Sequence, residues 1–201
     1  MIDYNWFQLH KSLIRHSEDQ NIKELNVLFN YAWMVVDNID RFTRIYEKLP
    51  SASNHKNLDS IKSVRIFRNT FAHLDERIDE IFLQTHTPFF GTLSWVYKDT
   101  AEKKLIPHVA ISGINYGVQS KFKLPDYSVD LPTISNIQLQ SSNKNGKNSI
   151  FIDELIIKLK SIVNETELHM EKQFIEQGIK RFDWSKQRDI LLKIESIEKL
   201  K

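Results

Sequence analysis

The longest regular pattern of apolar positions in this chain lies between Asp19 and Leu49. Apolar side chains recur there at three- and four-residue steps, at Leu25, Leu28, Phe29, Ala32, Val35, Val36, Ile39, Phe42, Tyr46 and Leu49. This spacing places them along one side of an α-helix, close to a heptad seam. The segment starts with Ser17-Glu18-Asp19-Gln20, which has the form of a capping box, and Pro50 follows its end. The sequence therefore predicts a long helix over Asp19–Leu49.

A second apolar stripe follows after a short polar link. Its members recur at the same helical steps, at Leu58, Ile61, Val64, Phe67, Phe71, Leu74, Ile78 and Ile81. The link Pro50–Asp59 is short and polar, which suits a reversal of the chain direction. We therefore expect Asp19–Leu49 and Asp59–Gln84 to pack as an antiparallel helical hairpin.

The pattern changes from helical to strand-like between Pro88 and Gly146, a window that holds eight of the ten glycines and prolines. It contains three β-type runs, Thr92–Tyr97, Leu105–Ser112 and Ile134–Leu139. The first two flank a polar stretch and are expected to form a hairpin.

These patterns together predict a mainly α protein, a helical bundle with a small antiparallel β insertion. We expect a helical hairpin in residues 1–86, a β and loop insertion in 87–140, a flexible polar linker in 141–149, and C-terminal helices that complete the bundle in 150–201. The C-terminal helices are predicted over Ile152–Gln177, closed by Gly178, and over Asp183–Leu200.

Composition limits the function classes. The chain has 201 residues, of which 41% are hydrophobic and 27% charged, an ordinary globular balance. It has no cysteine, which excludes disulfides and thiolate metal sites and fits a cytoplasmic protein. There is no HExxH, phosphate-binding glycine loop or GxSxG motif, and no apolar run of membrane-spanning length. We therefore expect no metal, no cofactor and no membrane contact, and the net charge of +2 implies that any RNA contact is local.

The segment with the clearest chemistry is Arg68-Asn69-Thr70-Phe71-Ala72-His73. A guanidinium offers a planar pair of donors to phosphate, and imidazole transfers protons near neutral pH. Five residues subtend about 140° on a helix, so Arg68 and His73 lie on different flanks of the apolar stripe. Two copies facing each other across a two-fold axis would bring both pairs into one site. The alternative is a solvated Arg68 and a His73 that binds a nearby carboxylate such as Asp75 or Glu76.

This helix pair resembles the HEPN superfamily. The resemblance rests on two stretches, Tyr31-Ala32-Trp33-Met34-Val35-Val36-Asp37-Asn38-Ile39-Asp40-Arg41-Phe42 and Val64-Arg65-Ile66-Phe67-Arg68-Asn69-Thr70-Phe71-Ala72-His73-Leu74-Asp75-Glu76-Arg77. The family signature is an arginine, a polar residue, three to five further residues and a histidine, on the second of two long antiparallel helices. The resemblance covers about the first 85 residues.

The resemblance implies a metal-independent endoribonuclease of the toxin–antitoxin or defence type, with a composite site in a homodimer and a cognate antitoxin as a further partner. Arg68 and His73 match the catalytic pair, and Asn69 matches the polar position. A subgroup carries tyrosine two residues after the histidine, where a partner enzyme modifies it. This chain has Asp75 there, which argues against that subgroup.

Two further alternatives concern the surroundings of the motif and its activity. Asp37 and Arg41 are spaced to pair with each other. Alternatively, Arg41 adds positive charge to the site while Asp37 or Asp75 orients a catalytic side chain. For the whole protein, the alternative to the ribonuclease is a non-catalytic helical module for binding or assembly.

Overall fold

The structure is a computed structural model of the whole chain. It describes residues 1–19, 21–22, 24–49, 56–72, 88, 90–111, 131–143 and 146–178, and the statements below concern these residues. The chain divides into two compact units, Met1–Ile162 and Val163–Lys201. The first unit holds the sheet and the helices that pack on it.

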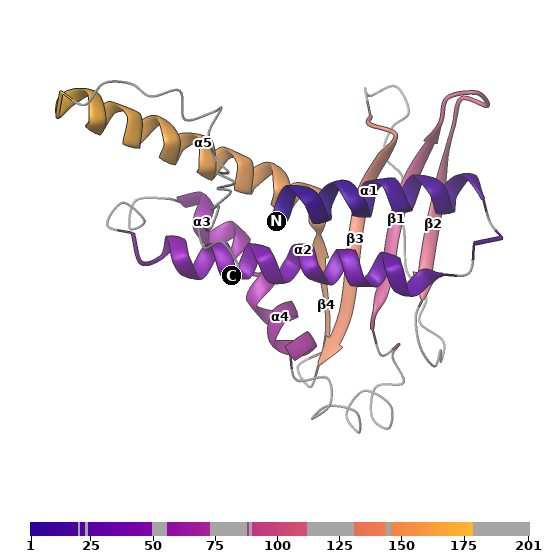
Figure 1. Cartoon of the computed structure of the whole chain (residues 1–201). Coiled ribbons are helices and arrows are strands. Elements are labelled where there is room, and N and C mark those ends of the chain that lie inside the picture. Colours follow the sequence, from indigo (N-terminus) through magenta and orange to yellow (C-terminus); the bar gives the residue numbers. More distant parts are fainter. Residues whose placement is uncertain are drawn as a thin grey trace, which may run out of the picture. The chain divides into compact units, whose positions relative to one another are not determined.

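Two helices, α1 (Ile2–Glu18) and α2 (Leu25–Tyr46), run antiparallel and side by side (Figure 1). The sequence did not predict α1, and it placed a helix start at Ser17. The structure instead has Ser17 in the last turn of α1, where its hydroxyl donates to the Leu13 carbonyl at 2.8 Å. The capping-box prediction was therefore wrong, because these residues end one helix rather than begin the next.

The predicted second helix is divided in the structure. Helix α3 (Lys56–Ile61) is separated by a turn at Lys62 and Ser63 from α4 (Val64–Ala72), which packs on α2. The apolar stripe is buried as expected in the described part, at Leu58, Ile61, Val64 and Phe67. The rest of the predicted helix, to Gln84, lies outside the described residues.

Four strands form one antiparallel sheet in the order β2-β1-β3-β4. Their bounds are β1 Thr92–Asp99, β2 Lys104–Ile111, β3 Ile134–Asn143 and β4 Gly146–Phe151. The predicted hairpin with a polar tip is confirmed, since β1 pairs with β2 from Thr92 to Asp99. In place of the linker expected over 141–149, β3 and β4 pair up to the Asn143–Gly146 pair.

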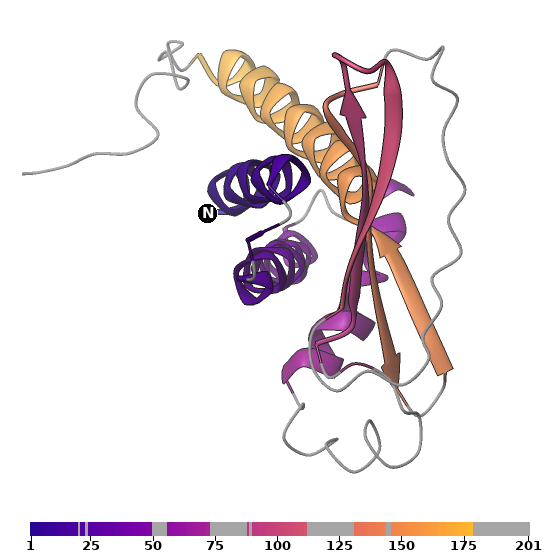
Figure 2. The same ribbon diagram turned by 90° about the vertical axis from the view of Figure 1, so that its right-hand side faces the viewer.

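The prediction of a helical bundle with a β insertion is wrong, because the sheet forms a large part of the core and the fold is a mixture of helices and sheet. One row of paired residues crosses all four strands: Ala110, Leu93, Leu139 and Ile150. Directly opposed residues share a face of a sheet, and all four side chains are buried. Helices α1 and α2 lie on one face of this sheet (Figure 2).

Side-chain hydrogen bonds join the helices to the sheet. The Trp95 indole of β1 donates to the Ser17 hydroxyl of α1 at 2.9 Å, and the Tyr97 hydroxyl lies 3.4 Å from a Glu18 carboxylate oxygen. The Trp33 indole of α2 donates to the Phe90 carbonyl at 3.1 Å, just before β1. The two indole bonds satisfy the polar ends of tryptophans that are otherwise buried in the core.

A β-bulge in β3 is held by the next helix. Between the pairs Ser94–Gln138 and Val96–Ser135, β3 carries one residue more than β1, and Asn136 there has a φ of 53°. The Asn136 N–H donates to the Asp153 carboxylate at 2.8 Å. Burial raises the pKa of Asp153, and the N–H bonds it accepts act in the opposite direction.

Asp153 lies in the first turn of α5 (Ile152–Glu176), which confirms the predicted helix Ile152–Gln177. Gly178 has the expected left-handed φ of 72° and donates its N–H to the Ile175 carbonyl at 3.0 Å. The second predicted C-terminal helix, Asp183–Leu200, lies outside the described residues. In the described part of the chain, none of the helices combines the length and the apolar character needed to cross a bilayer.

Candidate functional site

The motif Arg68-Asn69 lies on the flank of α4, beside the buried stripe. The Arg68 side chain is 36% exposed and Asn69 is exposed, so both reach solvent. The motif continues past Ala72, the last described residue of α4, and both His73 and Asp75 lie outside the described residues. The part of the site that the structure describes is therefore Arg68, Asn69 and their neighbours on α2.

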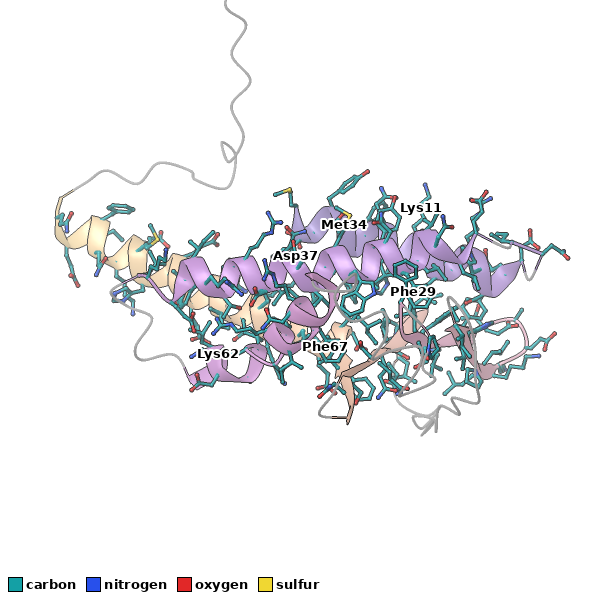
Figure 3. The ribbon with its side chains drawn as sticks, turned by 90° about the horizontal axis from the view of Figure 1, so that it is seen from below. Lys11, Phe29, Met34, Asp37, Lys62 and Phe67 are labelled. Atoms are coloured by element: carbon teal, nitrogen blue, oxygen red, sulfur yellow. The ribbon has the colours of Figure 1, made fainter. Side chains whose placement is uncertain are left out.

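Arg68 faces two carboxylates of α2. Its Nε lies 3.8 Å from Asp37 Oδ1 and 3.9 Å from Asp40 Oδ2. Figure 3 shows Asp37 on α2 and Phe67, the residue before Arg68, on the neighbouring helix α4. The packing of Phe67 against Trp33, with ring centroids 6.2 Å apart, helps to place α4 where Arg68 can reach Asp37 and Asp40.

Asp40 is the centre of this cluster. Its side chain is 1% exposed, and three arginines surround it. Arg44 Nε lies 2.7 Å from Oδ2, Arg65 Nε lies 3.5 Å from Oδ1, and Arg68 approaches from the same helix as Arg65. A buried carboxylate needs such partners, because leaving it unpaired in a low-dielectric site is costly. Asp40 therefore ties α2 to α4 through charge as well as packing.

Asp37 forms a second, more exposed pair in the cluster. Its Oδ2 accepts a 2.7 Å bond from Arg41 Nε, and its Oδ1 faces Arg68. The predicted pairing of Asp37 with Arg41 is confirmed. The Arg41 side chain is 67% exposed, so it keeps most of its contact with solvent. Asp37 thus brings Arg41 and the motif arginine together.

The cluster continues toward α3. Glu47 accepts bonds from Arg65 at 3.0 Å and faces Lys62 at 3.3 Å, and Lys62 also bonds Asp59 at 2.7 Å. Bonding to Arg65 lowers the pKa of Glu47, and bonding to Asp59 and Glu47 raises the pKa of Lys62. Both effects stabilise the charged forms. The whole cluster contains five cationic side chains and four carboxylates.

Sequence reasoning placed Arg68, Asn69, Asp37 and Arg41 at the site, and it missed Arg44 and Arg65. Two signals were present. Asp40 and Arg44 have the i,i+4 spacing of a helical ion pair, and Asp40 directly follows the apolar seam residue Ile39. A carboxylate beside a buried seam needs cations, and Arg44 is the nearest in sequence.

Comparisons with known proteins add no relative to this picture. No family model, no curated protein and no solved structure matches the chain. Within the described ranges, no group of three or more histidine, aspartate or glutamate side chains is arranged to hold a metal ion.

Proposed function

We propose that this protein is a metal-independent endoribonuclease that cleaves RNA with Arg68, Asn69 and His73 in a homodimer. The observation that carries the proposal is the placement of Arg68: a partly exposed guanidinium of the Arg-Asn-x3-His motif, oriented by Asp37 and Asp40 yet open to solvent. A toxin held by a cognate antitoxin would use the same chemistry.

The reaction is an internal transfer within RNA. The ribose 2′-oxygen forms a bond to the adjacent phosphorus while the bond from phosphorus to the 5′-oxygen breaks. His73 takes the 2′-OH proton or supplies one to the leaving 5′-oxygen, and Arg68 stabilises the negative charge on the phosphorane. Asn69 bonds a non-bridging oxygen or positions the ribose. The products are a 2′,3′-cyclic phosphate and a 5′-OH.

The geometry of the motif is the reason for proposing a dimer. Arg68 and His73 are five positions apart in the sequence, and on the helix that the sequence predicts this spacing would direct them to different flanks. A second protomer related by a two-fold axis supplies the missing half of the site. Sedimentation velocity across the micromolar range should therefore show a dimer, and a monomer throughout that range would contradict the composite site.

The test of the function is RNA cleavage in the presence of a chelator. Purified protein should cut single-stranded RNA and leave DNA of the same sequence intact, because DNA lacks the 2′-OH. His73→Ala and Arg68→Lys should both abolish or severely reduce cleavage. Arg68→Lys is informative because it keeps the charge and loses the planar pair of donors. Wild-type protein that cuts no RNA and is not toxic on expression would sink the proposal.

A second candidate is a non-catalytic helical module for binding or assembly. The observation that favours it is the engagement of Arg68 with both Asp37 and Asp40, which is also what a purely structural arginine would show. In that case Arg68→Lys and His73→Ala would alter dimerisation or stability, and RNA would remain intact with all three proteins.

A further inference from the structure

The arginines of α2 are held by their inner edges. Arg41 bonds Asp37 through Nε and Arg44 bonds Asp40 through Nε, at 2.7 Å in each case. Arg68 also approaches its two carboxylates through Nε. A carboxylate bonded to Nε does not cover the terminal edge of the guanidinium, where each of the two Nη groups presents an N–H. Each of these arginines is therefore oriented by carboxylates on its Nε side, one for Arg41 and for Arg44 and two for Arg68, and can still offer a planar pair of donors to another anion.

These edges belong to side chains that reach solvent. Arg41 is 67% exposed and Arg44 is 47% exposed, whereas the carboxylates that hold them are 30% and 1% exposed. The cations thus lie farther out than the anions. An incoming anion therefore meets the guanidinium groups before it meets the carboxylates.

We propose that Arg41 and Arg44 bind the phosphates of an RNA strand on either side of the one that Arg68 engages. The choice of RNA rests on the proposed function, whereas the phosphate chemistry rests on the geometry alone. Arg41 and Arg44 are one turn apart on α2, and Asp37 and Asp40 repeat the same spacing one turn earlier. A repeated carboxylate-held guanidinium suits a polymer with regularly spaced phosphates better than a single small anion.

The experiment measures binding without cleavage. Protein carrying His73→Ala is titrated against a fluorescent single-stranded RNA, and the dissociation constant is measured by anisotropy between 50 and 200 mM salt. The logarithm of the association constant falls as the logarithm of the salt concentration rises. Each lost phosphate contact should make the slope of this line less negative by about 0.7. Arg41→Gln tests the more exposed contact. Arg44→Lys tests the other one, and it keeps a cation beside Asp40 so that the fold is retained.

Arg41→Gln should make the slope of log association constant against log salt concentration less negative by about 0.7. Arg44→Lys should keep the slope and weaken binding by roughly threefold or more, because lysine lacks the planar edge. The matched control is Arg15→Gln, an exposed arginine of α1 outside the cluster, which should change neither quantity. DNA of the same sequence should bind with the same slope, since the contacts are to phosphate. Melting temperatures are measured for every variant to verify the fold.

Failure of this inference is distinguishable from failure of the ribonuclease. If wild-type protein cuts RNA but Arg41→Gln and Arg44→Lys leave RNA binding unchanged, the proposed phosphate contacts of Arg41 and Arg44 are absent. The ribonuclease proposal is then unaffected. If wild-type protein cuts no RNA but Arg41→Gln reduces the salt dependence of binding as described, the phosphate contacts are supported and the ribonuclease proposal is wrong. Two results would contradict the proposed phosphate contacts. One is a salt dependence that Arg15→Gln reduces as much as Arg41→Gln does, and the other is the absence of RNA binding at 50 mM salt.

Discussion

The Nε of Arg68 on α4 lies 3.9 Å from Oδ2 of Asp40 on α2, and the Asp40 side chain is almost completely buried. The motif arginine therefore belongs to a network anchored in the core rather than to a freely solvated helix flank. Because Asp40 also holds Arg44 and Arg65, its charge orients several guanidiniums at once. An arginine fixed in this way loses little side-chain entropy when it binds a phosphate, which favours both proposed roles.

Asp40→Asn should destabilise the fold strongly. The variant removes the charge that Arg44, Arg65 and Arg68 surround, and breaking a buried ion pair costs about 3–5 kcal/mol. The matched control is Asp37→Asn on the same helix, where the side chain is 30% exposed and the expected loss is about 1 kcal/mol or less. Chemical denaturation measures both. Equal losses in the two variants would show that burial of Asp40 carries no special weight.

The hydrogen bond between Trp95 and Ser17 should couple α1 to the sheet. Ser17→Ala leaves the Trp95 indole N–H without its acceptor, and an unsatisfied group of this kind costs about 1–3 kcal/mol. Trp95→Phe removes the donor and part of the ring. In a double-mutant cycle the two changes should be non-additive, with a coupling free energy of about 0.5–3 kcal/mol for residues in contact. Strict additivity of the two free-energy changes would refute the contact.

Stability should fall as the pH drops below 6.5. Burial lowers the pKa of His10 and of His108 from the usual 6.5, and Lys160 lowers that of His10 further. The unfolded chain therefore binds more protons between the lowered values and 6.5, so this stabilisation is fully present above 6.5 and is lost as pH falls. Within the described residues, Nε2 of both rings is buried without a hydrogen-bond partner, so a proton added there is poorly solvated.

Denaturation midpoints of wild type, His10→Gln and His108→Gln between pH 5 and pH 8 test this dependence. Each substitution should flatten the curve below 6.5, because glutamine does not titrate. His169→Gln, on the exposed surface of α5, is the control and should leave the curve unchanged. If the midpoints of His10→Gln and His108→Gln fall with pH below 6.5 as steeply as those of wild type, the two histidines do not cause the pH dependence.

The bulge in β3 should depend on Asp153 as a hydrogen-bond acceptor. Asp153→Ala leaves the Asn136 N–H without its 2.8 Å partner, at a cost of about 1.5–3 kcal/mol for a bond to a charged group. Asp153→Asn keeps an acceptor oxygen and should cost less. Thermal unfolding gives the order wild type, Asn, Ala. If Asp153→Ala were more stable than Asp153→Asn, the hydrogen bond from the Asn136 N–H would not be what determines stability at this position.

Asn136 itself should tolerate glycine and reject a β-branched residue. Its φ of 53° lies in the left-handed region, where most L-residues are strained by about 1–2 kcal/mol and glycine is not. Asn136→Gly should therefore stay near wild-type stability, and Asn136→Val should lower it clearly. The same unfolding assay measures both variants, and a stable Asn136→Val would show that the bulge relaxes when the residue changes.

The sequence by itself determined the elements that depend on local patterns. The β1–β2 hairpin follows from two alternating runs around a polar tip, and α5 with Gly178 at its end follows from helical periodicity and a C-terminal glycine. The apolar seam predicted for the long helix is buried at seven positions from Leu28 to Tyr46, and the described part of the stripe in α3 and α4 is buried as predicted, whereas Leu49 lies beyond the end of α2 and is exposed. In each case the signal lies within one helix, one hairpin or one helix end, where short-range sterics and periodicity decide the conformation.

Tertiary structure decided the fold class and the surroundings of the motif. The sheet enters the core because Leu93 of β1 pairs with Leu139 of β3. In addition, Trp95 donates a hydrogen bond to Ser17, although the two residues are separated by 78 positions in the sequence. Likewise, Asp40 meets Arg65 25 residues later only because α4 packs on α2. Periodicity within a segment carries no information on which distant segment it will face. The identity of the buried carboxylate that orients Arg68 was therefore set by the packing of one helix on another.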